Sequence, residues 1–168
     1  MSAPINANRR NFLQAAGSGV AALAASQFGL VRPAFAQGAS ISAPMGPIRQ
    51  INTGTLSTGY FETGPATGPV VILLHGWPYD IHSFAEVAPL LAAKGYRVIV
   101  PHLRGYGTTT FLSADTPRNG QQAVLAMDII ELMNALKIEK ALIAGYDWGA
   151  RTANIVAALW PERVKAMV

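Results

Sequence analysis

The sequence contains one carboxylate in a setting that would expose it at a turn. Asp147 lies at the centre of a Gly-Tyr-Asp-Trp-Gly segment, which directly follows the apolar run 141–144. A sharp strand-to-helix turn needs small flanking residues, which Gly145 and Gly149 supply, and it presents its central side chain at the carboxyl edge of a sheet. A carboxylate held out in this way can attack an electrophilic carbon. We therefore predict Asp147 as a catalytic nucleophile.

An aspartate at the start of a helix also has a simpler explanation. As an N-cap, Asp147 would accept hydrogen bonds from the first backbone N–H groups of the helix, worth about 1 kcal/mol. A plain cap needs neither a preceding buried strand nor two flanking glycines, so the whole pattern favours the nucleophile. The Gly-x-Asp-x-Gly segment could also be a chance match in a doubly wound nucleotide-binding protein. This alternative is disfavoured, because no Gly-x-Gly-x-x-Gly or Walker segment follows a predicted strand.

A second motif follows the apolar run 70–74 and reads His-Gly-Trp-Pro at 75–78. Together with the Gly-x-Asp-x-Gly turn, it resembles the α/β-hydrolase family, in the branch that holds epoxide hydrolases, haloalkane dehalogenases and fluoroacetate-type dehalogenases. The resemblance implies an oxyanion hole formed by the backbone N–H groups of Trp77 and Trp148. Two fixed donors in a dry site strongly stabilise negative charge that develops in a transition state.

The segment 101–107 carries a third resemblance. Its Pro-His-Leu-Arg-Gly-Tyr-Gly sequence is similar to the Asp-x-Arg-Gly-x-Gly segment of the same family, with His102 where aspartate is usual. This departure bears on the subfamily and not on the fold. The three motifs stand in the family's order at the ends of predicted strands, and the resemblance covers residues 49–168.

The resemblance implies a reaction that begins with attack of Asp147 on an sp3 carbon and passes through an alkyl-enzyme ester. The expected substrate is a small apolar electrophile, with no cofactor and no metal ion. Haloalkane dehalogenases have Asn where Trp77 stands, and the fluoroacetate type has Arg where Trp148 stands, so epoxide hydrolysis is favoured. The alternatives are a haloalkane or haloacid dehalogenase and a non-catalytic binding protein with the same fold.

The three histidines of the chain, His75, His82 and His102, all precede Asp147. In the family the order is nucleophile, acid and then histidine, so none of the three is expected to be the base. The cap domain would also follow the last predicted strand. We therefore expect a partial enzyme, truncated before the cap domain and inactive by itself, with an exposed edge strand at its end.

Buried strands alternate with helices along the chain. Apolar runs predict strands at 49–56, 60–63, 70–74, 97–100, 141–145 and 164–168, and helical spacing predicts helices at 82–93, 121–136 and 148–160. This order predicts an α/β fold, a mostly parallel sheet with helices on both faces. By resemblance, residues 49–168 form the N-terminal part of an α/β-hydrolase core.

Residues 1–36 have the order of a signal peptide. A twin-arginine pair at 9–10 precedes a weakly apolar stretch, and Ala-Phe-Ala at 34–36 matches a cleavage site. This pattern is typical of Tat export, so we expect a periplasmic or secreted protein that is exported by the Tat machinery. We expect no stable membrane anchor. Residues 37–48 are expected to form a flexible leader into the fold.

Composition excludes several other classes of protein. The chain is 51% hydrophobic and has no cysteine, so it can bury a core and has neither disulfides nor thiolate sites. Its net charge of +4 comes mostly from three arginines within residues 1–36. The remainder is nearly neutral and shows no basic stripe interleaved with aromatic residues, so nucleic-acid binding is not expected.

Overall fold

The computed structural model describes residues 45–168. The predicted signal peptide at 1–36 and the leader as far as residue 44 lie outside the described residues. Met45 and Ile48, at the end of the predicted leader, are partly buried and pack against the core. Within 45–168, no helix is both long enough and apolar enough to cross a membrane.

Strands and helices alternate through most of the described chain. The strands are β1 (Arg49–Thr53), β2 (Leu56–Thr63), β3 (Val70–Leu74), β4 (Arg97–Pro101), β5 (Thr110–Phe111), β6 (Ala141–Gly145) and β7 (Val164–Met167). The helices are α2 (Val87–Ala93), α3 (Gln122–Ala135) and α4 (Trp148–Leu159), with short 3-10 helices η1 (Ile81–Phe84) and η2 (Pro161–Arg163).

All the described strands join one sheet, in the order β1-β2-β4-β3-β6-β7, with β5 paired to β2. Strands β4, β3, β6 and β7 run parallel, whereas β1, β2 and β5 form an antiparallel flank. The parallel strands are connected through helices, as parallel pairs require. This arrangement confirms the predicted α/β fold.

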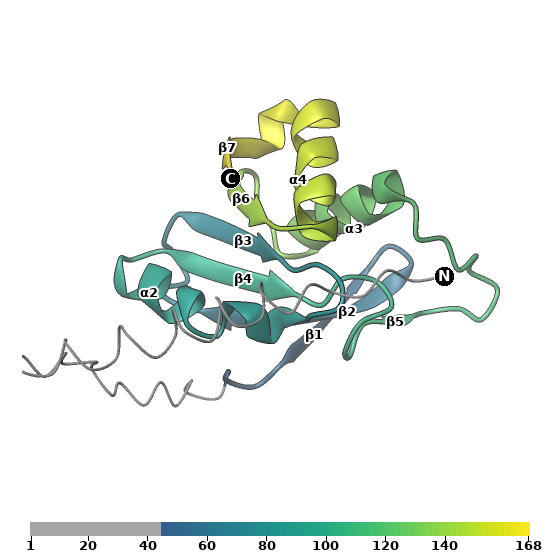
Figure 1. The fold of residues 1–168 in the computed structure, drawn as a ribbon, viewed down its shortest axis with the longest axis horizontal. Coiled ribbons are helices and arrows are strands. Elements are labelled where there is room, and N and C mark those ends of the chain that lie inside the picture. The colour runs from purple at the N-terminus through teal and green to yellow at the C-terminus, as the bar shows by residue number, and fades with distance from the viewer. Residues whose placement is uncertain (1–44) are drawn as a thin grey trace, which may run out of the picture. The chain divides into compact units, whose positions relative to one another are not determined.

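The two faces of the sheet are covered by different helices (Figure 1). On β3, Ile72 and Leu74 point into a core with α3 and α4, whereas Val71 and Leu73 point into a second core with η1 and α2. Alternate residues of a strand face opposite sides, so a strand covered on both sides must be apolar throughout. The continuous apolar run at 70–74 meets this need.

Strand β2 is longer than predicted and begins at Leu56. It forms a hairpin with β1 through the two-residue loop Gly54-Thr55, in which Gly54 has a φ of +53°. Gly59 lies inside β2 and does not end it, because it pairs with Gln50 of β1, and the Thr108 side chain approaches this position so closely that a Cβ atom would collide with it. That close approach comes from a distant loop and leaves no local sequence signal.

The helix predicted at 82–93 is two separate pieces, η1 and α2. Pro89 lies in the first turn of α2, where its missing N–H would have no partner. In one continuous helix its ring would meet the carbonyl of Ala85 and break the turn. The first piece, η1, has its own N-cap, Asp80, whose carboxylate accepts the backbone N–H of His82 at 2.9 Å.

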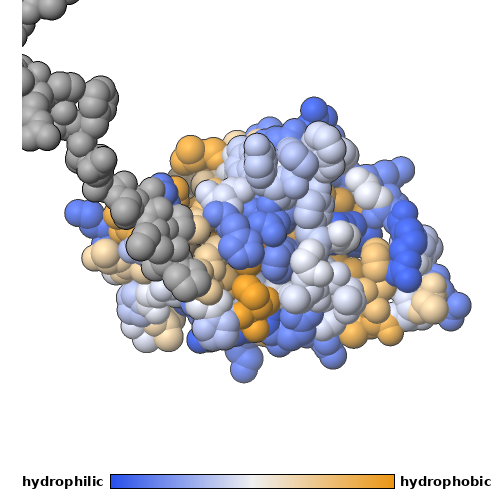
Figure 2. Space-filling model, turned by 60° about the horizontal axis from the view of Figure 1, so that its bottom comes forward, coloured by the Kyte–Doolittle hydropathy of each residue, from blue (hydrophilic) through white to orange (hydrophobic). Residues whose placement is uncertain are grey.

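The molecular surface is mainly polar in the view of Figure 2, with hydrophobic residues gathered in a few small patches. The exposed large apolar side chains of the described residues include Trp77, Tyr79 and Leu90, with exposed fractions of 64 to 69%. Trp77 and Tyr79 belong to the loop after β3, which leads to the site described next.

Candidate active site

The three predicted motifs meet at the carboxyl edge of the parallel strands. Leu74 at the end of β3 pairs with Gly145 at the end of β6, so the loops that follow these strands start side by side. The loop after β4 joins them through a hydrogen bond from the backbone N–H of Leu103 to Nε2 of His75, at 3.2 Å. This edge of the sheet is where open α/β folds place their ligand sites.

Asp147 occupies a strained turn between β6 and α4. Its φ is 51° and its ψ is −116°, a conformation that residues with a side chain rarely adopt. A Cβ atom on Gly145 would lie 2.6 Å from the carbonyl carbon of Gly149, and one on Gly149 would collide with the backbone of Leu74. Both glycines are therefore required by the close approach of α4 to β3 and β6.

The Asp147 side chain does not cap its own helix. Its Oδ2 instead accepts the backbone N–H of Trp77, at 2.9 Å, from the loop after β3. The backbone N–H groups of Trp148 and Trp77 hold the pKa of Asp147 below its usual value, with a smaller contribution from the charge of Arg151. The structure thus brings together all three residues predicted for the site, with Asp147 exposed to solvent and ionised.

Gly76 makes the contact between Trp77 and Asp147 possible. A Cβ atom at this position would lie 2.6 Å from Cβ of Asp147 and 2.8 Å from its Oδ2. Only a glycine lets the loop after β3 lie this close to the elbow. The Trp77–Pro78 peptide that follows is cis.

The histidine of the same motif, His75, is fully buried and connects two of the loops. Because its Nε2 accepts a hydrogen bond from Leu103, the neutral ring carries its proton on Nδ1. The Tyr106 ring packs edge-on against it with the ring centroids 4.7 Å apart. Burial lowers the pKa of His75, which keeps the ring neutral and the contact with Leu103 intact.

The other two histidines, His82 and His102, make no hydrogen bond with Asp147. His82 pairs with Asp80, with 2.9 Å between Nδ1 and Oδ1. His102 is buried after β4, and its Nδ1 has no hydrogen-bond partner among the described residues. No described histidine therefore lies in hydrogen-bond contact with Asp147.

A buried ion pair fixes the loop after β4 to α3. Arg104 donates to both carboxylate oxygens of Asp128, at 2.6 and 2.7 Å, and to the backbone carbonyl of Asn119, at 2.7 Å. Burial raises the pKa of Asp128 although Arg104 opposes the shift. The sequence marks Arg104 through its motif, but nothing in the sequence marks Asp128 as its partner, because the contact joins separate elements.

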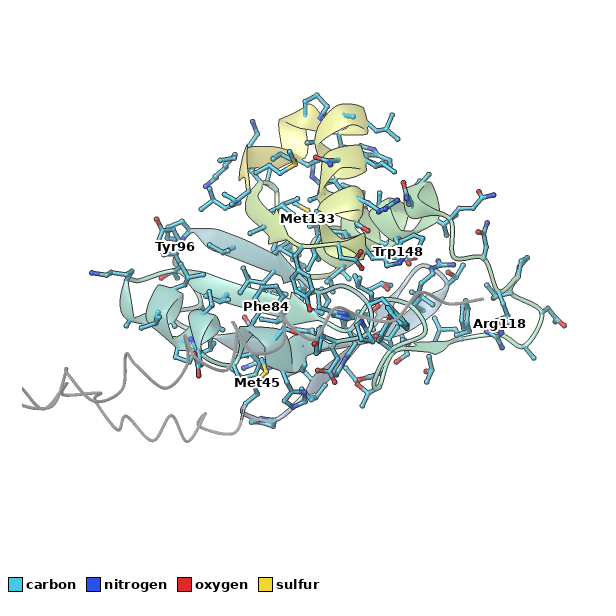
Figure 3. The ribbon with its side chains drawn as sticks, in the orientation of Figure 1. Met45, Phe84, Tyr96, Arg118, Met133 and Trp148 are labelled. Carbon is cyan, nitrogen blue, oxygen red and sulfur yellow. The ribbon has the colours of Figure 1, made fainter. Side chains whose placement is uncertain are left out.

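Tyr146 makes two contacts with η1 that the sequence did not predict. The Tyr146 hydroxyl and Oγ of Ser83 lie 2.7 Å apart, and the ring centroids of Phe84 and Tyr146 are 5.9 Å apart. These contacts join the elbow to η1, the short helix that ends with Phe84, which is labelled in Figure 3. The only sequence signal was the position of Tyr146 inside the elbow motif.

A cavity of about 180 Å³ adjoins the elbow. It is lined by Gly76, Leu103, Arg104, Tyr106, Gly120, Leu125 and Trp148. Most of these side chains are apolar, and few polar groups reach the space, which suits a small organic ligand. Within residues 45–168, no cluster of three or more histidine or acidic side chains is placed to hold a metal ion.

Comparison with known families agrees with this geometry. Residues 69–168 match the family model described as the alpha/beta hydrolase fold. The chain belongs to the α/β-hydrolase fold family.

Similar proteins of the α/β-hydrolase family include several epoxide hydrolases. Epoxide hydrolase 3 of Siraitia grosvenorii is 38% identical over 118 residues, covering 70% of this chain and 36% of the relative. Fluoroacetate dehalogenase of a Burkholderia species is 38% identical over 102 residues, covering 60% of this chain and 33% of the relative. The α/β-hydrolase chain thus spans about a third of the length of these relatives.

Solved structures show the same similarity. A Klebsiella pneumoniae protein assigned to the epoxide hydrolases is 64% identical with a TM-score of 0.73, covering 76% of this chain and 42% of that one. Potato epoxide hydrolase I is 31% identical with a TM-score of 0.66, covering 72% of this chain and 38% of that one.

Proposed function

We propose that this α/β-hydrolase chain carries the nucleophilic half of an epoxide hydrolase, with Asp147 as the nucleophile. The observation that supports this proposal best is the hydrogen bond from the Trp77 N–H to Oδ2 of Asp147, at 2.9 Å. It orients the carboxylate at an exposed, strained turn and leaves Oδ1 as the attacking oxygen. An N-cap would direct these oxygens to the helix instead.

In the proposed first step, Oδ1 of Asp147 attacks an epoxide carbon. The new C–O bond forms the ester as the ring C–O bond breaks, and the released alkoxide takes up one proton from an acid or from water. In the second step, water gives one proton to a base as its oxygen adds to the carboxyl carbon of the ester, and the carbonyl electron pair moves to Oδ2. The N–H groups of Trp77 and Trp148 would then stabilise this oxyanion in place, without rearrangement. Collapse of this intermediate breaks the bond between the carboxyl carbon and Oδ1, which leaves with the diol and takes up the proton.

Epoxides are preferred as substrates because several relatives of this chain are named epoxide hydrolases, including those with 33 to 38% identity. A haloacid is the second candidate. It is supported by the match to fluoroacetate dehalogenase at 38% identity. Both substrates react with the same carboxylate, through attack on an sp3 carbon and formation of an ester.

We further propose that residues 1–168 form the ester but do not release it. Hydrolysis of the ester needs a base that activates water, and the three histidines of the chain are engaged elsewhere or lack contact with Asp147. The proposed fragment therefore stops after one step, with the ester accumulating on the enzyme.

The test is to incubate the purified chain with styrene oxide and to locate any adduct by peptide mass spectrometry. One adduct on Asp147, absent from Asp147→Asn and present in the control Glu162→Gln, supports the proposal. An adduct at another residue, or equal labelling of Asp147→Asn, contradicts the nucleophile. Steady release of diol from the 168-residue chain contradicts the proposed block of the second step.

The N-terminal segment supports a proposal about location. We propose that the Arg9-Arg10 pair directs the chain to Tat export and that cleavage follows Ala36. In a bacterial host, replacement of both arginines by lysine is expected to retain the protein in the cytoplasm with its N-terminus uncleaved. Periplasmic recovery of the processed double variant at the wild-type level argues against this route.

A further inference from the structure

A groove extends from the elbow across the segment that leads into α3. It is shallow and widely open to solvent, has a volume of about 750 Å³ and is lined by residues 117–122 and Trp148. It shares Gly120 and Trp148 with the 180 Å³ cavity beside Gly76. Asp147 itself lines neither space, but its neighbour Trp148 and Gly76, whose position faces the Asp147 side chain, line the cavity, so a ligand that fills both spaces lies beside the elbow.

The groove presents a cation, Arg118, on the segment between β5 and α3 (Figure 3). Its guanidinium carbon lies 4.0 Å from the centroid of the Phe111 ring. None of the ion pairs within residues 45–168 includes Arg118. The neighbouring Arg104 differs in this respect, because Asp128 takes up its charge through two hydrogen bonds.

A second group in the groove can donate hydrogen bonds. The Asn119 side-chain oxygen accepts the backbone N–H of Gln121, at 2.8 Å, and its backbone carbonyl accepts from Arg104. Both acceptors of Asn119 are thus engaged, whereas its amide N–H groups have no partner among the described residues. The groove accordingly offers donors and positive charge, and no acidic side chain lines it.

We propose that this groove binds the carboxylate end of the substrate, with Arg118 as the specificity-determining residue. The substrate class is then an electrophile that carries a carboxylate, such as an epoxy acid. This inference rests on the proposed function for the reacting carbon at Asp147, whereas the binding of the anion can be tested by itself.

Three physical features support this assignment. The planar guanidinium matches a carboxylate with two parallel N–H donors. Stacking on Phe111 restricts the Arg118 side chain before the ligand binds, which lowers the entropy lost on binding. In addition, an anionic substrate is repelled by the ionised Asp147, and a separate cation at the other end of the ligand offsets this repulsion.

The experiment measures binding of two unreactive ligands, 3-phenylpropanoate and 3-phenylpropanamide, by isothermal titration calorimetry. The amide has the same shape and no charge. The variants are Arg118→Gln and Arg118→Lys, with Lys140→Gln as a control that removes one positive charge before β6, at the other end of the sheet from the elbow. Far-ultraviolet circular dichroism checks that each variant is folded.

We expect the carboxylate to bind about tenfold more tightly than the amide, a factor of ten being 1.4 kcal/mol. Arg118→Gln removes this preference, Arg118→Lys keeps part of it, and Lys140→Gln keeps it all. Equal binding of the two ligands by the wild-type chain, or an unchanged preference in Arg118→Gln, overturns the inference. Equal loss in Lys140→Gln also overturns it, because the effect would then be one of net charge.

A second measurement separates this inference from the proposed function. The chain is treated with 4-(oxiran-2-yl)benzoate, whose carboxylate lies at the opposite end of the molecule from the epoxide, or with its amide, and adducts on Asp147 are quantified. Preferential labelling of Asp147 by the carboxylate reagent supports both the proposed function and the anion site, provided that Arg118→Gln removes the preference. In that variant the concentration of carboxylate reagent that gives half-maximal labelling is expected to rise. If Arg118-dependent carboxylate binding is present and neither reagent labels Asp147, the proposed function fails and the anion site stands.

Discussion

The backbone N–H of Trp77 lies 2.9 Å from Oδ2 of Asp147, although the two residues are 70 positions apart in the sequence. Two separate turns of the chain meet at this bond, one after β3 and one after β6. Because Leu74 and Gly145 pair in register, the turns start from neighbouring points of the sheet. The proposed chemistry depends on this contact, since it orients the carboxylate and places a donor where an oxyanion would form.

The first prediction concerns the pH dependence of Asp147. The N–H groups of Trp148 and Trp77 lower its pKa below the ordinary value of 3.8. A carboxylate with a lowered pKa stays ionised until the pH falls through that lowered value. We therefore expect labelling of Asp147 by an epoxide to keep its full rate down to pH 4.5, as checked by mass spectrometry at each pH. A half-maximal rate at or above pH 3.8, the ordinary value, would contradict the lowered pKa.

The second prediction is that Gly76→Ala disrupts the site. The new Cβ atom would lie 2.6 Å from Cβ of Asp147, so either the loop or the elbow must move. A displacement of about 1 Å is expected to slow labelling of Asp147 by about 100-fold. In the matched control, Gly46→Ala, the new methyl group meets only the Phe61 ring, at 3.3 Å, and labelling is expected to persist. Unchanged kinetics in Gly76→Ala would show that the contact is not required.

The third prediction links two buried histidines to stability. Burial lowers the pKa of His75 and that of His102 below 6.5 in the folded chain. Below pH 6.5 the unfolded chain therefore binds more protons than the folded one, and the free energy of unfolding falls as the pH drops toward the lowered values. The slope is at most about 1.4 kcal/mol per pH unit for each histidine.

Urea unfolding between pH 5 and 7.5 measures this slope. His102→Asn is expected to reduce it, because one of the two buried groups is removed. His82→Gln serves as the control, since the His82 side chain is 67% exposed, and it is expected to retain the wild-type slope. A slope that is lost in the control, or that is unchanged in His102→Asn, would refute the link to burial.

The fourth prediction concerns the ion pair of Arg104 and Asp128, whose side chains are 7 and 15% exposed. Asp128→Ala leaves a buried guanidinium without its partner and is expected to lower the free energy of unfolding by about 3 kcal/mol. Replacing both residues by leucine is expected to destabilise less than Asp128→Ala alone, because no unpaired charge is left. Urea unfolding of Asp128→Ala, Arg104→Leu, Asp128→Leu and the double leucine variant supplies the comparison, and strict additivity of the two single leucine variants would argue against coupling.

The sequence by itself determined the elements whose signals are local. The apolar runs at 70–74 and 141–145 are strands covered on both faces, and both were predicted with the bounds that the structure has. The glycines around Asp147 predicted the elbow, because close approach of a strand and a helix excludes a Cβ atom. The order of motifs at strand ends also predicted that Trp77, Trp148 and Asp147 would gather at one edge.

Tertiary structure decided the features that depend on distant partners. Gly59 lies inside β2 where Thr108, from a distant loop, leaves no room for a Cβ atom, and Asp128 became the partner of Arg104 only when α3 packed beside the loop after β4. The position of Arg118, which no ion pair within residues 45–168 includes, in a groove that leads to Trp148 likewise has no signature along the chain. A residue's type and its neighbours in sequence set local backbone preference, whereas burial, pairing and proximity are set by contacts that form only when the chain folds.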